Sequence, residues 1–364
     1  MTEAPVLAAC TIASQRKENV MRRRRCRLVL VVLVSWASVL GTGCGRPGRE
    51  PKYTGPKVTL AIRFAPGSYV QTEEMDMEMK LWDDEREHEV MMSQEVLTSG
   101  DVVIDERDDS GEQTVAYTLR RVRMDISVPG REISADSDAR WQGGRDELRE
   151  TLSALVGWRA ELRGRDGKLK ADPRAMEDLN ERMSRSFMMR GGQAQALGKM
   201  MGPLLDELLT RHWGALLPGK PVGPGDTWQK QMTLKTVPML GEMTLDCDCR
   251  LVDVEESDGK KIAVLRFTVR TSVGSRAIDV SAMGGPGASK AQLEELQLDL
   301  DGIARFDVAL GLSTSMRLWE RISGVMSATS PSGKIERVNL ALSLTGRTRF
   351  EAASARKSDA EIGQ

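Results

Sequence analysis

Two closely spaced cysteines are the first candidates for chemistry in this sequence. Cys247 and Cys249 stand in the run Asp246-Cys247-Asp248-Cys249. On a β-strand, residues two apart point to the same face, and their Cα atoms lie about 6.5–7 Å apart. This separation is at or beyond the span that a disulfide accommodates. The pair could ligate a metal or act as redox thiols, although no further ligand lies nearby in the sequence. The alternative is that both are small core residues facing inward.

The remaining polar residues give no catalytic pattern. The chain has only two histidines: His88 lies among glutamates, and His212 precedes Trp213 near an expected helix end. No HExxH, GxSxG, P-loop or dinucleotide-binding arrangement occurs. Asp299 and Asp301 precede Gly302 but lack the downstream ligands of a calcium loop. We therefore expect a protein that is not an enzyme and has no cofactor.

The clearest functional signal is an N-terminal export segment at residues 21–43. Five arginines in residues 22–27 precede an uncharged apolar run, residues 28–40. That run is shorter than the roughly 20 residues of a spanning helix and has the proportions of a signal-peptide core. The sequence Leu40-Gly41-Thr42-Gly43-Cys44 resembles a bacterial lipobox, with leucine one place further upstream than usual. The resemblance implies lipidation of Cys44, and the alternative is an ordinary signal peptide with an incidental cysteine.

Lipidation at Cys44 would place the protein at the cell envelope. Two or more acyl chains, such as palmitate, give lasting membrane attachment. Gly45 follows the cysteine where an aspartate favours inner-membrane retention in some bacteria, so the outer membrane is the favoured destination. Residues 1–20 lack apolar periodicity, and we expect translation to begin at Met21. Residues 44–56 are rich in glycine, proline and charge and predict a tether.

The charge balance argues against nucleic acid as a partner. Lys and Arg number 52 against 53 Asp and Glu, and the arginine-rich signal segment takes positive charge away when it is cleaved. Nucleic-acid binding needs a basic surface, which this composition does not provide. We expect contact with the membrane through the N-terminal lipid, and with envelope proteins or a hydrophobic ligand.

Alternating apolar residues predict an α+β fold that is predominantly antiparallel β. The first β-rich half, residues 57–216, has a helical insert at about 145–213. Strands are expected at 57–64, 69–82, 88–97, 101–107, 114–128, 158–163 and 168–170. Leu148, Leu152 and Leu155 have helical spacing, and Asp172-Pro173 is a helix start. A connector at 217–228, with three prolines and three glycines, precedes a second β-rich half at 229–350. Strands are expected there at 243–254, 261–272, 303–309, 313–323 and 335–350. A loop is expected at 281–290, and a polar tail at 351–364.

Methionine is abundant, with 20 residues, while aromatic residues make up only 4% of the chain. Methionine suits irregular apolar binding surfaces because it is flexible and polarizable. One hypothesis is an apolar groove between a curved sheet and methionine-rich helices. Its candidate ligand-binding residues are Met183, Phe187, Met188, Met200 and Met201. The alternative is an ordinary core in which methionine replaces leucine and phenylalanine.

The overall pattern resembles an uncharacterised family of secreted bacterial lipoproteins, β-rich and of unknown function. The resemblance is carried by residues 217–228, LPGKPVGPGDTW, and by residues 301–307, DGIARFD. These motifs consist of residues that favour turns, and they imply no catalytic residues. The leading hypothesis is a non-enzymatic, lipid-anchored envelope protein with a binding or scaffolding role. The second hypothesis is a carrier or sensor of a lipid-like ligand held between the sheet and the helices.

Overall fold

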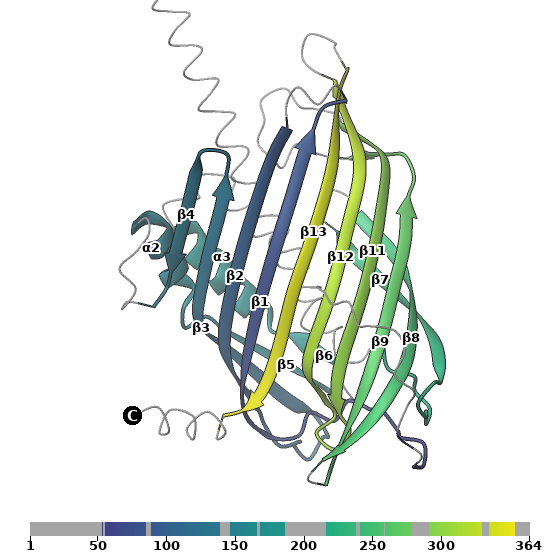
Figure 1. The fold of residues 1–364 in the computed structure, drawn as a ribbon. Helices are drawn as coiled ribbons and strands as arrows, with labels where there is room; N and C mark the ends of the chain where they lie inside the picture. The colour runs from purple at the N-terminus through teal and green to yellow at the C-terminus, as the bar shows by residue number, and fades with distance from the viewer. Residues whose placement is uncertain are drawn as a thin grey trace, which may run out of the picture.

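The protein is predominantly antiparallel β-sheet with few helices (Figure 1). The computed structural model describes residues 53, 55–84, 89–138, 146–165, 168–185, 216–237, 241–257, 259–278, 291–329 and 335–353. Within them, thirteen strands form one sheet. In Figure 1 the central strands lie nearest the viewer and the edge strands β5, β6 and β7 recede behind them. The sheet is therefore curved, and the figure shows its outer face.

The strands of the first half are β1 (Gly67–Trp82), β2 (Glu89–Ile104), β3 (Gln113–Val128), β4 (Arg131–Asp136), β5 (Arg159–Arg165) and β6 (Lys168–Ala171). Those of the second half are β7 (Thr227–Val237), β8 (Gly241–Ser257), β9 (Lys260–Val273), β10 (Arg276–Ile278), β11 (Ala291–Asp307), β12 (Leu312–Thr329) and β13 (Ile335–Ala352). Their order in the sheet is β6-β5-β3-β2-β1-β13-β12-β11-β9-β8-β7, with β4 beside β3 and β10 beside β11. In the described residues this sheet does not close on itself.

Pairing of the first and last strands joins the two halves. β1 runs antiparallel to β13, with a register that extends from Tyr69 opposite Ala352 to Trp82 opposite Asn339. Side chains alternate across each strand, so one face of β1 carries buried methionines and the other carries charge. Met77 and Met79 are both buried on the inner face, while Glu78 between them is exposed.

The strand predicted at residues 57–64 is wrong. Only Val58 pairs, in an isolated bridge with Val222 of the connector. The alternating burial that suggested a strand is real, because Val58, Leu60 and Phe64 are all buried. Phe64 has φ 44°, in the left-handed region, so the chain turns there and cannot continue as a strand. This segment covers core side chains without joining a ladder.

The two strands predicted at 88–97 and 101–107 are one continuous strand, β2. Its register against β3 shifts between Ser99 and Gly100, where Arg120 is the extra residue of a bulge on β3. A Cβ atom at Gly100 would lie 2.5 Å from the ring of Tyr117, so only glycine lets this ring pack against the strand. β4, β7, β10 and the first part of β11 were not predicted. The predicted strands at 158–163, 168–170, 261–272 and 335–350 match β5, β6, β9 and β13 closely.

Two helices lie on one side of the sheet. Helix α2 (Asp146–Leu155) packs against β3 and β4, and α3 (Pro173–Arg185) packs against α2 and β5. Asp172 Oδ1 accepts a hydrogen bond from the Arg174 backbone N–H at 3.0 Å, as expected of an N-cap. The Nε1–H of buried Trp158 donates to the Ala175 carbonyl at 2.8 Å and ties α3 to the sheet. The rest of the predicted helical insert, from residue 186 to 213, lies outside the described residues, as does the loop predicted at 281–290.

Buried side chains form three clusters on the inner face. The helix-side cluster comprises residues of β1–β5, β13 and the two helices, including Met77, Leu344, Leu152 and Leu179. The connector-side cluster comprises residues of β8, β9, β11 and β12 with Val58, Leu60, Leu217 and Val222. The end cluster contains Phe64, Tyr69 and Phe350, where the Tyr69 and Phe350 rings stack at 4.7 Å.

An ion pair between a half-exposed arginine and a buried aspartate joins β4 to β3. Asp136 is completely buried and lies opposite Arg123 in the register, and its carboxylate is held by Arg121. The Arg121 Nε–H donates to Asp136 Oδ1 at 3.0 Å, and the Asp138 backbone N–H donates to the same oxygen at 2.9 Å. The Arg121 guanidinium, as the largest influence, holds the pKa of Asp136 below its ordinary value. The charged form of Asp136 is therefore the form that the fold stabilises.

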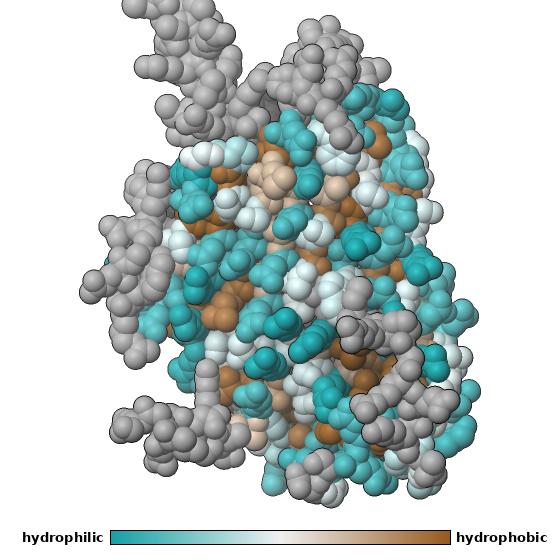
Figure 2. All heavy atoms as spheres, viewed as in Figure 1, coloured by the Kyte–Doolittle hydropathy of each residue, from teal (hydrophilic) through white to brown (hydrophobic). Residues whose placement is uncertain are grey.

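The outer face of the sheet is mixed in character. Figure 2 shows hydrophilic side chains interspersed with smaller apolar areas over the face seen in Figure 1. Ion pairs cross this face, including Arg266 with Asp301 at 3.3 Å and Arg305 with Glu255. None of the helices in the described residues has the length and apolar character that crossing a lipid bilayer requires.

Candidate functional site: the inner face of the sheet

A row of inward-facing side chains crosses the middle of the sheet, one from each of eight strands. We call it the central belt. In sheet order it consists of Cys247 (β8), Val269 (β9), Leu300 (β11), Glu320 (β12), Leu344 (β13), Met77 (β1), Gln94 (β2) and Ile126 (β3). Its apolar members are all buried. Residues directly opposite each other on neighbouring strands project from the same face of a sheet, so each of these side chains lies beside its neighbours in the row.

Glu320 is an acidic residue in the centre of this apolar row. It lies between Leu300 and Leu344 across the sheet, and Leu318 and Ile322 flank it on its own strand face. Glu320 Oε2 is buried and has no hydrogen-bond partner in the described part of the chain. Burial alone raises the pKa of Glu320 to about 8. The side chain therefore carries its proton at neutral pH, because no cation offsets the cost of charging it there.

Two further polar residues lie on the same face. Gln94, in the central belt, is only 1% exposed. Glu73 lies on β1, two rows from the belt, and accepts a hydrogen bond from Gln71 Nε2 at 2.6 Å and one from Thr98 Oγ1 at 3.5 Å. Burial raises the pKa of Glu73, and these hydrogen bonds oppose that effect. Glu73 thus differs from Glu320 in having partners within the fold.

Glu320 stands where two apolar clusters meet. Leu300 on one side belongs to the connector-side cluster, and Leu344 on the other side belongs to the helix-side cluster. Ile322, one step along β12, is only partly buried and packs against both clusters. The seam between them thus runs along β12 and β13, and Glu320 lies on it.

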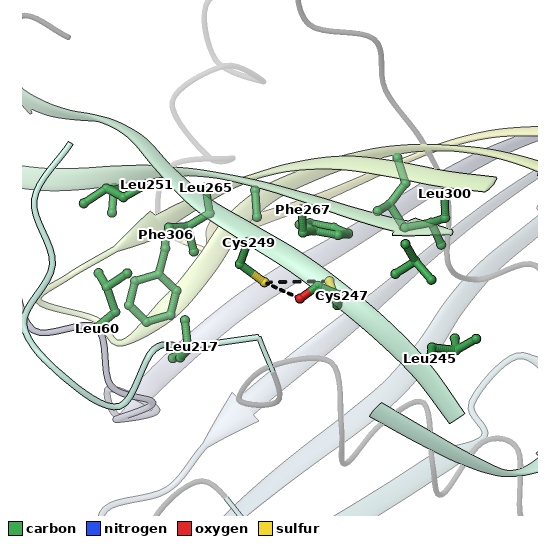
Figure 3. Packing of buried hydrophobic residues seen from close by; sticks show 14 of the residues in the cluster. Leu60, Leu217, Leu245, Cys247, Cys249, Leu251, Leu265, Phe267, Leu300 and Phe306 are labelled. Atoms are coloured by element: carbon green, nitrogen blue, oxygen red, sulfur yellow. Dashed lines mark hydrogen bonds between the residues drawn. The ribbon is translucent and has the colours of Figure 1, made fainter. Parts of the chain in front are cut away.

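The cysteine pair is part of the connector-side cluster. Figure 3 shows Cys247 and Cys249 on one strand among Phe267, Leu265 and Leu300. Both cysteines are buried and free, with 3.7 Å between the two Sγ atoms. The Cys247 sulfur, followed by burial, raises the pKa of Cys249 and keeps it as a thiol at neutral pH. Among the described residues, no third His, Cys, Asp or Glu joins them in a group that could hold a metal ion.

The ligand-binding residues expected from sequence are not brought together by the described structure. Met183 lies in the last turn of α3, and its side chain is outside the described set. Phe187, Met188, Met200 and Met201 lie outside the described residues, as does Cys44. The methionines that the structure does place on the inner face are on strands, chiefly Met77, Met79 and Met92.

Glu320, Glu73 and Gln94 were missed by sequence reasoning, although a signal for them existed. In Leu318-Trp319-Glu320-Arg321-Ile322, strand alternation puts the glutamate on the face of the leucine and isoleucine. The same parity aligns Glu73 with Met75 and Met77. Acidic residues are abundant in this chain. Glu320 and Glu73 differ from the solvated ones only in that they alternate in phase with the apolar residues of their strands.

Comparison with known proteins gives no family. No family model matches the chain, and no curated protein matches it. Among solved structures, OpdQ of Pseudomonas aeruginosa is 9% identical, with 78% of this chain and 99% of that chain covered and a TM-score of 0.23. DynF from the dynemicin biosynthesis pathway of Micromonospora chersina is 11% identical, with 86% and 96% covered and a TM-score of 0.17.

A DUF1329 family protein from Desulfovibrio piger is 8% identical, with 78% and 85% covered and a TM-score of 0.12. TM-scores this low do not establish a common fold. The class of the protein, a predominantly antiparallel β protein with a curved sheet, therefore rests on its own strands and their register.

Proposed function

We propose that this protein is a non-enzymatic, lipid-anchored cell-envelope protein that binds a hydrophobic, lipid-like ligand on the inner face of its sheet. The observation that carries the proposal is the central belt, a mostly apolar row eight strands wide whose central acid, Glu320, has an oxygen without a hydrogen-bond partner in the described residues. Binding sites for apolar ligands are mostly apolar, with a few placed polar groups that fix orientation. The belt has this composition.

The anchor and the sheet have complementary roles in this proposal. Acylation at Cys44 holds the protein at a membrane, and the tether at 44–56 lets the sheet reach the lipid surface. A ligand taken from that surface keeps its apolar part away from water while it lies on the inner face. Scaffolding of other envelope proteins is the second candidate, supported by the same anchor and by the long exposed outer face.

Ligand binding can be tested on the chain from Gly45 to Gln364, because every described strand and cluster lies within it. This chain is delipidated, incubated with a bacterial envelope lipid extract and examined by native mass spectrometry. We expect a stoichiometric adduct of lipid mass. A clean apo mass after incubation would refute the carrier function and leave scaffolding as the remaining candidate.

The location of the ligand can be tested by photo-crosslinking with a diazirine-bearing fatty acyl ester. We expect labelled residues to alternate along β1 and β13, with Met77 and Leu344 modified and their outward-facing neighbours Glu78 and Ser343 unmodified. Labelling of the outward residues instead would place the ligand on the wrong face.

The anchor itself needs a separate test in cells. Wild type and Cys44→Ser are expressed with an alkyne-bearing palmitate analogue, and membranes are separated from soluble extract. We expect wild type to incorporate the label and to sediment with membranes, and Cys44→Ser to lose the label. Equal labelling of both proteins would exclude Cys44 as the acylated residue.

A further inference from the structure

Glu320 lies on the inner face with a carboxyl oxygen that lacks a hydrogen-bond partner in the described residues. This oxygen, Oε2, is buried, and burial without a partner is unfavourable for a polar group in apolar surroundings. Glu73 on the same face has two side-chain partners, so burial of an acid here does not by itself prevent pairing. The missing partner of Glu320 is therefore specific to its place at the seam.

The apolar surroundings determine the protonation state of the Glu320 carboxyl group. The side chains that face Glu320 across the sheet are Leu300 and Leu344, and those beside it on β12 are Leu318 and Ile322. None of them is charged or titratable. An isolated carboxylate in such surroundings costs far more than a neutral acid, so Glu320 is held as a neutral hydrogen-bond donor.

A neutral donor selects a neutral acceptor. A cationic amine would force Glu320 to ionise, and the desolvation of a buried ion pair offsets much of the attraction that it gains. A fatty acid anion would be desolvated in the same apolar row. An ester or amide carbonyl accepts a hydrogen bond from the carboxyl O–H without creating a charge, and acyl chains on either side of it would meet the leucines and methionines of the belt.

We propose that Glu320 is the recognition point for the carbonyl group of an acyl ester or amide, the neutral linkage of acylated lipids. This inference rests on the proposed function and specifies the ligand's chemical class. Glu320 donates a hydrogen bond from its carboxyl O–H to the carbonyl oxygen, and the acyl chain lies along the seam between the helix-side and connector-side clusters. No covalent step is involved. The residue fixes the position of the linkage, and the belt supplies the affinity for the chain.

The experiment compares three probes of similar length by isothermal titration calorimetry on Gly45 to Gln364. Methyl decanoate carries an ester carbonyl, undecane carries no acceptor, and decylamine carries a cation. Wild type is expected to bind methyl decanoate about 3- to 10-fold more tightly than undecane, the range for one buried neutral hydrogen bond. Decylamine is expected to bind no better than undecane.

Variants at Glu320 separate recognition from packing. Glu320→Met keeps the length of the side chain without a donor, and it is expected to bind both methyl decanoate and undecane with the affinity of wild type for undecane. Glu320→Gln keeps an N–H donor and is expected to retain the preference for the ester. Ser343→Ala is the matched control, because Ser343 lies next to the belt residue Leu344 on β13 but is exposed on the outer face, so the preference should stay unchanged.

Stability provides a second readout. Glu320→Met removes a buried partnerless oxygen and is expected to raise the melting temperature while it lowers ester affinity, the pattern of a residue kept for binding. Equal affinity of wild type and Glu320→Met for methyl decanoate would overturn the inference and leave the proposed function intact. Tighter binding of decylamine than of the ester would overturn it in favour of a cationic ligand. If no probe binds to wild type, the proposed function fails as well.

Discussion

Replacement of Glu320 by glutamine should flatten the pH dependence of stability. The folded protein holds the pKa of Glu320 at about 8, above the ordinary value of 4.5. Between these two values the folded chain binds one proton that the unfolded chain has lost. The free energy of unfolding of wild type therefore falls as pH rises through this window and levels off above the folded pKa. Glutamine is nearly isosteric and does not titrate, so the variant loses this component.

The magnitude follows from the linkage relation. One proton difference changes the free energy of unfolding by about 1.4 kcal/mol per pH unit. Between pH 5.5 and 7.5 the ceiling for Glu320 is therefore about 2.7 kcal/mol, and partial exposure of the residue as a whole lowers it, so we expect about 1–2 kcal/mol. Glu73 contributes in the same direction because burial raises its pKa too. All other titrating groups are common to wild type and variant and cancel in the comparison.

The assay is urea unfolding of Gly45 to Gln364 at pH 5.5, 6.5 and 7.5 and constant ionic strength. Free energies from linear extrapolation are compared after coincident fluorescence and circular dichroism transitions confirm two-state behaviour. Glu73→Gln is the comparison variant: burial raises the pKa of Glu73, but its hydrogen bonds from Gln71 and Thr98 oppose that effect, so this variant should flatten the slope less than Glu320→Gln does. If Glu320→Gln retains the full wild-type slope, Glu320 ionises normally in the folded protein. The belt would then be hydrated there, and the argument for a neutral ligand would fail.

Two further predictions concern the scaffold that holds the inner face. Arg121→Met leaves the buried carboxylate of Asp136 without its cation and should cost about 2–3 kcal/mol in urea unfolding, since Arg121 is itself 42% exposed, whereas Arg120→Met removes only an exposed pair and should cost under about 1 kcal/mol. Similar losses for the two variants would contradict this. Gly100→Ala pushes a methyl group into the aromatic ring on β3 and should lower stability by about 1–3 kcal/mol, while Gly274→Ala, with open space around it, should change it little. Equal thermal midpoints for the two alanine variants would show that the bulge is not tightly packed.

The alternation of apolar and polar residues predicted most strands. It reflects burial of one face of a strand, which can be recognised from neighbouring residues in the sequence. β9 and β13 were found almost at their true bounds for this reason. β7 was missed because its sequence, TWQKQMTLKTV, mixes polar side chains into both parities, as is common at a sheet edge. The segment around Val58 shows the opposite failure. Its alternation comes from packing onto the connector-side cluster, and periodicity does not distinguish packing from pairing.

Strand partners are the part that the sequence could not supply. Each half of the chain predicts an antiparallel meander, and neither predicts that β1 lies beside β13. That pairing joins residues more than 250 positions apart, such as Tyr69 and Ala352, and it is selected by the fit of two complete faces. The candidate site was unpredictable for the same reason, since five of its belt residues come from the second half and three from the first.

The long-range pairing of β1 with β13 also explains why Glu320 has apolar neighbours from both halves of the chain. Glu320 is on β12, and the strand that separates it from the first half is β13. Leu300 reaches it from the second half, whereas Leu344 belongs to a cluster made chiefly of first-half residues. The apolar surroundings that keep Glu320 neutral therefore exist only when both halves are assembled into one sheet. In an open or partly assembled chain, Glu320 would meet water, ionise and cease to be a donor. Ester preference is thus expected to appear only with the complete sheet, and to be lost in the same urea transition as the β1–β13 pairing.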